Sequence, residues 1–147
     1  MRILGIDHGE KRIGLAISDP MGFIAHGLPT IERINGKDYL KELADIIEEK
    51  DIGKIVVGLP KNMNDTIGKK AEEVLGFVEI LRSNFAIPVI TVDERLTTVR
   101  AYKAMSETKM SRKKKQKKVD MISAQLILQC YLDKLAHSPP DGRAGVR

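Results

Sequence analysis

Carboxylates at the ends of predicted strands are the residues with the clearest potential for chemistry. Asp7 ends the apolar stretch "RILGID", Asp93 and Glu94 end "IPVITVDE", and Asp120 opens a long apolar helical pattern. Converging carboxylates repel one another, and their pKa values rise, unless a cation lies between them. A hard divalent cation prefers oxygen ligands. Two such ions about 4 Å apart can clamp the attacking and leaving oxygens of a phosphodiester.

Each acid also has a structural explanation. Asp7 can accept backbone amide hydrogen bonds in the turn "HGEK", Asp93 can pair with Arg95, and Asp120 can favour its helix N-terminus electrostatically. Ligands of open α/β sheets gather beyond the carboxyl ends of strands, which favours a shared site. Neighbouring side chains of a strand point to opposite faces, so only one of Asp93 and Glu94 can join Asp7. The spacing leaves open which of the two it is.

The hydrophobic pattern predicts the elements that position these acids. Strands are expected within 2–7, 13–18, 23–31, 54–60 and 87–94, and helices within 37–50, 71–82, 96–107 and 119–135. The second helix should bury Ala71, Val74, Leu75, Val78 and Leu81. Three strands with tight turns form an antiparallel meander, and strands that alternate with helices pair in parallel. We therefore expect an α/β fold with a mixed five-stranded sheet flanked by helices on both faces.

The basic residues are concentrated in one segment of an otherwise slightly acidic chain. The net charge is +5, but without the seven cations of 109–118 there remain 18 basic and 20 acidic residues, a net charge of −2. Such a segment favours contact with a polyanion, and the alternative is a solvated loop. Without a partner, this dense run of like charges should be mobile.

Length and composition predict one domain, spanning 1–136, followed by a flexible tail over 137–147. The one cysteine, Cys130, cannot form an internal disulfide and is expected in the core. The sequence has no apolar run of about 20 residues and no signal-peptide core. We therefore expect a cytoplasmic protein without a membrane partner.

Four motifs together resemble the YqgF-type family: "IDHGEKRIGLAISD", "VVGLPKNMNDTIGKKAEEV", "VDERLTTV" and "KKVDMISAQLILQCYLD", which span about residues 2–135. Members of that family are RNase H-like nucleases related to Holliday-junction resolvases and implicated in bacterial pre-16S rRNA maturation. The resemblance implies an RNase H-like fold and metal-dependent hydrolysis of phosphodiester bonds in 5′-end maturation of the rRNA precursor. It implies Asp7, Glu94 and Asp120 as catalytic residues and as ligands of Mg²⁺ or Mn²⁺, and so selects Glu94 over Asp93.

The resemblance also points to Lys11, Arg12 and the "GLPKNM" loop as substrate-facing elements. Together with the basic segment, the expected nucleic-acid contacts are Lys11, Arg12, Lys61, Asn62, Arg95, Arg112, Lys113, Lys114, Lys115 and Lys118. A solvated turn is the alternative for Lys11. A helix-capping turn that uses Asn64, Asp65 or Thr66 is the alternative for the loop. His8 and Glu10 fall between the motif positions.

Two other functions fit parts of the sequence. A Holliday-junction resolvase would use the same acids on branched DNA and would require a symmetric dimer. A non-catalytic nucleic-acid-binding factor in ribosome maturation or transcription would use the basic segment but has no need of converging carboxylates. An actin- or hexokinase-type ATPase requires two such domains and is set aside. The expected partners are precursor rRNA or branched DNA, with ribosomal particles as a further candidate, for a monomer or a homodimer.

Overall fold

The computed structural model describes residues 1–34, 36–62, 64, 66–96, 102–103 and 113–136. A five-stranded sheet, in the order β3-β2-β1-β4-β5, forms its centre. The strands are β1 (Arg2–His8), β2 (Arg12–Ser18), β3 (Ala25–Glu32), β4 (Ile52–Leu59) and β5 (Val89–Asp93). Pairing is antiparallel in β3-β2-β1 and parallel in β1-β4-β5. The predicted mixed sheet is therefore confirmed.

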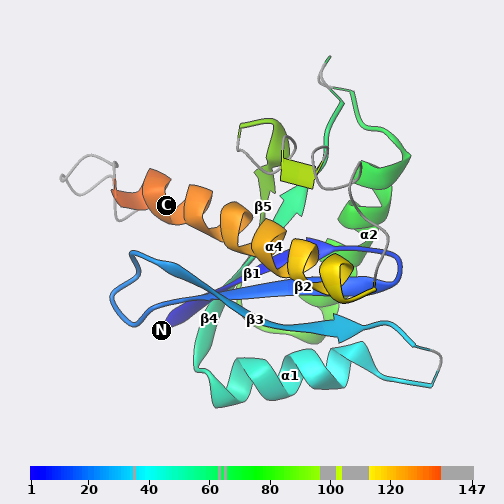
Figure 1. Ribbon diagram of the computed structural model, residues 1–147. Helices are drawn as coiled ribbons and strands as arrows, with labels where there is room; N and C mark the ends of the chain where they lie inside the picture. The colour runs from blue at the N-terminus through cyan, green and yellow to red at the C-terminus, as the bar shows by residue number, and fades with distance from the viewer. Residues whose placement is uncertain (35, 63, 65, 97–101, 104–112, 137–147) are drawn as a thin grey trace.

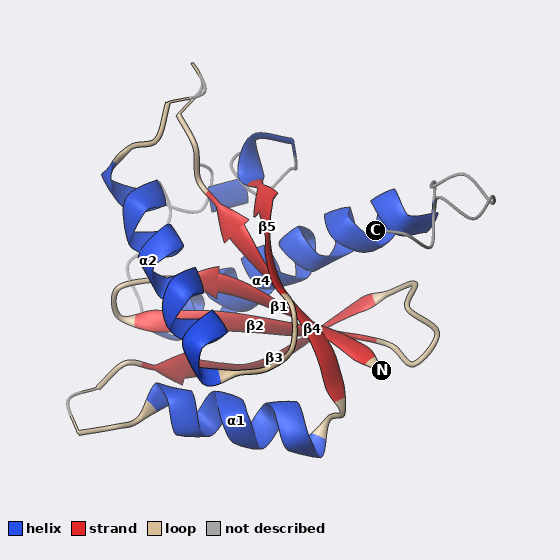
Figure 2. Ribbon diagram, turned by 180° about the vertical axis from the view of Figure 1, so that it is seen from behind, coloured by secondary structure: helices blue, strands red, loops and turns tan. Residues whose placement is uncertain are grey.

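Helices cover both faces of this sheet (Figures 1 and 2). The helices α1 (Tyr39–Glu49) and α2 (Lys69–Asn84) pack on one face, and α4 (Lys113–Ala136) crosses the other. A short 3₁₀ helix, η1 (Glu94–Leu96), follows β5. No helix within the described ranges is long and apolar enough to cross a membrane.

Alternation along β1 distributes its side chains between the two helical layers. Leu4 and Ile6 are fully buried with the residues of α1 and α2. Gly5 lies under α4, where an added Cβ would be 2.7 Å from the Cβ of Leu128. Asp7 follows with the same alternation, so its carboxylate faces α4. The strand thus delivers one carboxylate to the α4 side at its carboxyl end.

The predicted start of the last helix is wrong. Helix α4 begins at Lys113 rather than near Val119, so Asp120 lies two turns inside it and does not favour a helix N-terminus. Lysine and glutamine are good helix formers, and the first turns are attached to β3: Lys117 Nζ pairs with Glu32 Oε1 at 2.8 Å, and Thr30 Oγ1 donates to the Lys117 carbonyl at 3.1 Å. The basic segment is therefore helical over 113–118.

The prediction that α2 buries Leu75 is also wrong, because this side chain is 38% exposed and Phe77 is buried instead. The buried face of α2 includes Phe77 because it lies three residues after Val74, on the same side of the helix. The helix predicted over 96–107 lies largely outside the described residues. The predicted tail over 137–147 also lies outside them.

Candidate active site

Asp7 is a buried carboxylate at the carboxyl end of the central strand β1. Its side chain is 7% exposed, and its Oδ1 accepts a hydrogen bond from Lys103 Nζ at 2.7 Å. Burial raises the pKa of Asp7 to about 6, against the lowering effect of the Lys103 charge, while Glu94 and Asp120 raise it further. This carboxylate is therefore held where its negative charge is unfavourable, and any cation placed beside it would be stabilising.

Glu94 is the second buried carboxylate of the site. It is 4% exposed, and its Oε1 lies 3.5 Å from the same Lys103 Nζ. Gly58 of β4 makes room for this side chain, because a Cβ there would lie 2.8 Å from Glu94 Oε2. Asp7, near the end of β1, and Glu94, directly after β5, thus share one ammonium group.

Asp93 is directed elsewhere. Its carboxylate receives hydrogen bonds from the guanidinium of Arg95, the shortest of them 2.6 Å, and from the Arg95 backbone amide at 2.9 Å. These contacts lower the pKa of Asp93 to about 2. The structure therefore brings Glu94, rather than Asp93, to Asp7.

Asp120 approaches the site from α4. Gly14, which is opposite Asp7 in the β1–β2 register, lies directly under Asp120, and a Cβ at this glycine would collide with the Asp120 carbonyl. Arg12 Nε donates to Asp120 Oδ2 at 2.8 Å, and its Nη2 reaches Gln116 Oε1 at 3.4 Å. The third acid is therefore near the other two and is paired with its own cation.

The side-chain oxygens around Asp7 are of the type that binds a divalent metal ion, but a lysine lies between them in this conformation. Within the described residues, no three Asp, Glu, His or Cys side chains surround a common point in this conformation. Lys103 instead stands as a cation between two carboxylates, at the kind of position that a metal ion would take. Ser123, one turn after Asp120, is completely buried, and its Oγ has no hydrogen-bond partner in the part of the chain that the structure describes. Carboxylate and hydroxyl oxygens are hard donors, so the set fits Mg²⁺ or Mn²⁺ once Lys103 moves aside.

A cavity of about 710 Å³ opens beside the acids. Its lining combines the end of β1, the loop after β4 and the first turns of α2 with two residues of the acid site. These lining residues are His8, Gly9, Glu10, Pro60, Lys61, Asn62, Lys69, Lys70, Glu73, Val74, Glu94 and Lys103. Away from the acid site, the lining thus carries three lysines, Lys61, Lys69 and Lys70, together with the carboxylates of Glu10 and Glu73.

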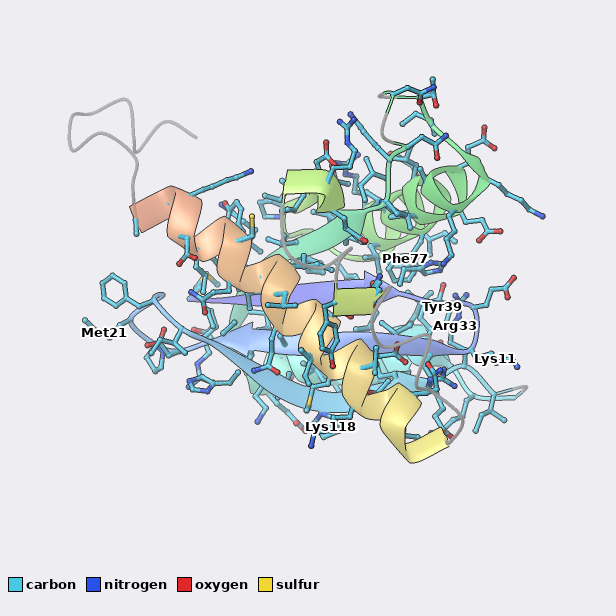
Figure 3. All side chains as sticks on the ribbon, turned by 45° about the horizontal axis from the view of Figure 1, so that its top comes forward. Lys11, Met21, Arg33, Tyr39, Phe77 and Lys118 are labelled. Carbon is cyan, nitrogen blue, oxygen red and sulfur yellow. The ribbon has the colours of Figure 1, made fainter. Side chains whose placement is uncertain are left out.

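The predicted nucleic-acid contacts are only partly brought together. Lys61 and Asn62 line the cavity, whereas Arg12 is paired with Asp120. Arg95 pairs with Asp93 and also donates to the Asn62 carbonyl at 3.1 Å. Lys11, on the β1–β2 turn, and Lys118, on α4, are exposed outside the cavity lining (Figure 3).

Arg112 lies outside the described residues, as do the side chains of Lys113, Lys114 and Lys115. In the loop after β4, Thr66 Oγ1 donates to Asn64 Oδ1 at 2.6 Å, but Gly68 is the N-cap of α2 and no side chain caps the helix. The capping role considered for Asn64 and Thr66 is therefore wrong.

Three residues of the site region were missed by the sequence analysis. Lys103 belongs to a segment predicted only as helical, and no local pattern marks it as the partner of Asp7. Arg33 Nη1 lies 2.8 Å from His8 Nε2 and 3.0 Å from the Gly9 carbonyl. Burial and the charge of Arg33 lower the pKa of His8 to about 4. The position of His8 directly after Asp7 was the one available signal.

Comparisons with known proteins show the family to which the chain belongs. Residues 1–134 match the family model RuvX, described as Holliday junction resolvase. A protein of Clostridium acetobutylicum named "Putative pre-16S rRNA nuclease" is 53% identical over 135 residues, covering 92% of this chain and all of that protein. A protein of Thermoanaerobacter pseudethanolicus with the same name is 50% identical over 134 residues, covering 90% and 96% of the two chains.

Solved structures share the fold at low sequence identity. RuvC of T. thermophilus in complex with Holliday junction substrate superposes with a TM-score of 0.53 at 12% identity, over 93% of this chain and 97% of that one. The Fowlpox virus resolvase with Holliday junction DNA gives a TM-score of 0.52 at 13% identity, over 92% and 99%. The RNase H-like architecture predicted from the motifs is therefore confirmed.

Proposed function

Because the chain belongs to the RuvX family, we propose that it is a divalent-metal-dependent nuclease that hydrolyses phosphodiester bonds in 5′-end maturation of precursor 16S rRNA. The observation that carries the proposal is the pair of buried carboxylates, Asp7 and Glu94, that share the Lys103 ammonium beside an open cavity. Buried acids of this kind are unfavourable in a purely structural role, and they cluster at functional sites.

In the proposed mechanism, Asp7, Glu94 and Asp120 would hold Mg²⁺ or Mn²⁺, and the chemistry that the bound ion would supply is the activation of a water nucleophile. Lys61 and Asn62 line the cavity and bind the phosphate backbone. Lys103, which lines the cavity, would neutralise a phosphate oxygen once it has left the carboxylates. Arg12 keeps Asp120 oriented toward the site through its 2.8 Å hydrogen bond.

The substrate is proposed from the relatives. The two relatives compared above, of which this chain covers nearly the full length, carry the name of a pre-16S rRNA nuclease. A Holliday-junction resolvase is the second candidate, favoured by the family description. A non-catalytic binding factor is less well supported, since it has no need of two buried carboxylates beside the cavity. We further propose that the protein acts in the cytoplasm, on a substrate carried by a ribosomal particle. It acts there as a monomer or a homodimer.

The test is a cleavage assay with a substrate panel. Purified protein is incubated with Mg²⁺ or Mn²⁺ and with a precursor-rRNA 5′-end fragment, duplex DNA and a four-way DNA junction, and the cuts are mapped. Asp7→Asn protein, purified in parallel, is the control for contaminating nucleases. Metal-dependent cuts in the RNA fragment alone support the proposal. Paired symmetric cuts in the junction alone would establish the resolvase instead, and binding without any cut would establish the binding factor.

A further inference from the structure

Arg33 determines which nitrogen of the His8 ring carries the proton. Its Nη1 lies 2.8 Å from His8 Nε2. A guanidinium group has hydrogen-bond donors and no acceptor, so Nε2 must accept this bond. The hydrogen of the neutral imidazole is therefore on Nδ1. The same Nη1 donates to the Gly9 carbonyl at 3.0 Å, which attaches Arg33 to the turn directly after β1.

Aromatic contacts hold the His8 ring in one orientation. The ring centroid lies 4.5 Å from that of Phe77, at an interplanar angle of 41°. The ring centroids of Phe77 and Tyr39 are 6.0 Å apart, and the Arg33 guanidinium lies 4.9 Å from the centre of the Tyr39 ring. Figure 3 shows Arg33, Tyr39 and Phe77 on the same side of the molecule, beside the end of β1. The imidazole is thus fixed by packing on its face and by a hydrogen bond at one edge.

The other edge of this ring is available to a ligand. Among the residues that the structure describes, none forms a hydrogen bond with His8 Nδ1. His8 lines the cavity that also includes Glu94 and Lys103. Side chains alternate along β1, so His8 lies on the opposite face of the strand from Asp7. It therefore borders the cavity from the α2 side, where Lys69 and Lys70 also line it.

We propose that the Nδ1–H of His8 donates a hydrogen bond to a phosphate oxygen of the bound nucleic acid, at the phosphate next to the one held at the acids, and that Arg33 is the positioning residue for this donor. The identity of the ligand rests on the proposed function. A neutral donor suits this place because it binds a phosphate without adding a charge that repels a metal ion at Asp7. Lys69 and Lys70 attract the phosphate backbone by their charge, and the directional hydrogen bond from His8 fixes the position of one phosphate oxygen.

The tautomer is tested by NMR on full-length protein labelled with ¹⁵N-histidine. The chain has three histidines, and His8→Phe identifies the signals of His8 by their loss. Long-range ¹H–¹⁵N correlations should show a proton on Nδ1 and none on Nε2. Arg33→Met should produce a mixture of tautomers, and Arg33→Lys, which retains a donor, should restore the single form at least in part. A proton on Nε2 in the unaltered protein would overturn the proposal.

Binding is tested with a fluorescein-labelled RNA duplex and a labelled four-way DNA junction, with Ca²⁺ in place of Mg²⁺ to prevent cleavage. His8→Phe retains the stacking on Phe77 and lacks the donor, so affinity should fall about tenfold, as for one hydrogen bond to a charged group. The matched control is His26→Phe, an exposed histidine of β3. Equal affinities of His8→Phe and unaltered protein for both probes would overturn the proposal. Binding that depends on His8 without any cleavage in Mg²⁺ would refute the proposed nuclease and leave this donor established.

Discussion

Lys103 Nζ lies 2.7 Å from Asp7 Oδ1, and these two residues are 96 positions apart in the chain. The contact brings a cation from the segment after η1 onto the carboxyl end of β1, where Glu94 Oε1 is 3.5 Å from the same nitrogen. The protein thus carries an internal counter-ion at the place where the proposed metal binds. Metal binding and the position of Lys103 are therefore coupled.

Removal of this internal counter-ion should strengthen metal binding. In Lys103→Met, no ammonium has to be displaced from Asp7 and Glu94, so the dissociation constant for Mn²⁺ should fall by about tenfold, equivalent to about 1.4 kcal/mol. Calorimetric titration with Mn²⁺, without nucleic acid, measures this. Lys118→Met, at an exposed position on α4, is the control for a general loss of positive charge. Weaker Mn²⁺ binding by Lys103→Met would contradict the displacement model.

Asp7→Asn should abolish metal-dependent cleavage, with a loss of at least about a hundredfold in rate. The substitution keeps the size of the side chain and removes the charge that the metal requires. At about pH 8 without metal, the melting temperature should be unchanged or higher, because a buried charge in an unfavourable environment has been removed. Cleavage rates and thermal unfolding in EDTA are the measurements. Retained cleavage would exclude Asp7 from the mechanism.

Asp7 also predicts a pH dependence of stability in the metal-free protein. Its pKa is raised from 3.8 to about 6 by burial, so between these values the folded state holds a proton that the unfolded state has lost. The contribution of Asp7 to the free energy of unfolding therefore decreases as pH rises through that window, by about 3 kcal/mol in total. Lys103, Glu94 and Asp120 face the same carboxyl, so the measurement is the difference in urea unfolding between unaltered protein and Asp7→Asn. A difference that stays constant from about pH 4 to 7 would contradict the predicted shift.

Glu94 and Asp93 should differ sharply in their effects on turnover. Glu94→Gln should reduce cleavage as strongly as Asp7→Asn, since both carboxylates face Lys103. Asp93→Asn weakens a pair with Arg95 that is largely shielded from solvent and should cost about 1 kcal/mol of stability, with turnover largely retained. Single-turnover rates and urea unfolding of the two variants separate these outcomes. The reverse order of effects would mean that Asp93 is the metal ligand.

The basic segment should dominate the salt dependence of binding. Replacement of Arg112, Lys113, Lys114 and Lys115 by Gln, which preserves helix propensity at the start of α4, removes four cations that can each neutralise a phosphate. The slope of log affinity against log salt should then flatten by up to about 3.6, or about 0.9 for each duplex phosphate that is no longer neutralised. Titrations of labelled duplex at several salt concentrations measure the slope.

The matched control for this variant removes four positive charges away from the site, by replacement of Lys37, Lys41, Lys50 and Lys134 with Gln. If the slope is the same for the basic-segment variant and unaltered protein, the nucleic-acid interface must be sought at Lys11 and Lys61 instead. Mn²⁺ affinity should remain unchanged in both quadruple variants, since neither removes a carboxylate of the acid site.

The fold could be predicted from the sequence because it is encoded in local periodicity. Alternating and helical apolar patterns identified the strands and three of the helices, and the order of these elements predicted a mixed sheet. Element ends were less predictable: α4 begins at Lys113 because its basic first turns are attached to β3 by contacts with Thr30 and Glu32, which no local pattern contains. The loss of apolar character marked the strand ends near Asp7 and Glu94, whereas Asp120 lies two turns inside α4, where no strand end marks it.

The sequence by itself determined that carboxylates would gather at one edge of the sheet, and only the tertiary structure decided how each is oriented and neutralised. Strand alternation could not choose between Asp93 and Glu94, because the strand ends at Asp93 and η1 redirects the chain at Glu94. The pairs Lys103–Asp7 and Arg12–Asp120 join residues 96 and 108 positions apart. Such pairs depend on the packing of α4 and the segment after η1 against the sheet, and ion pairing across that distance leaves no periodic signal in the chain.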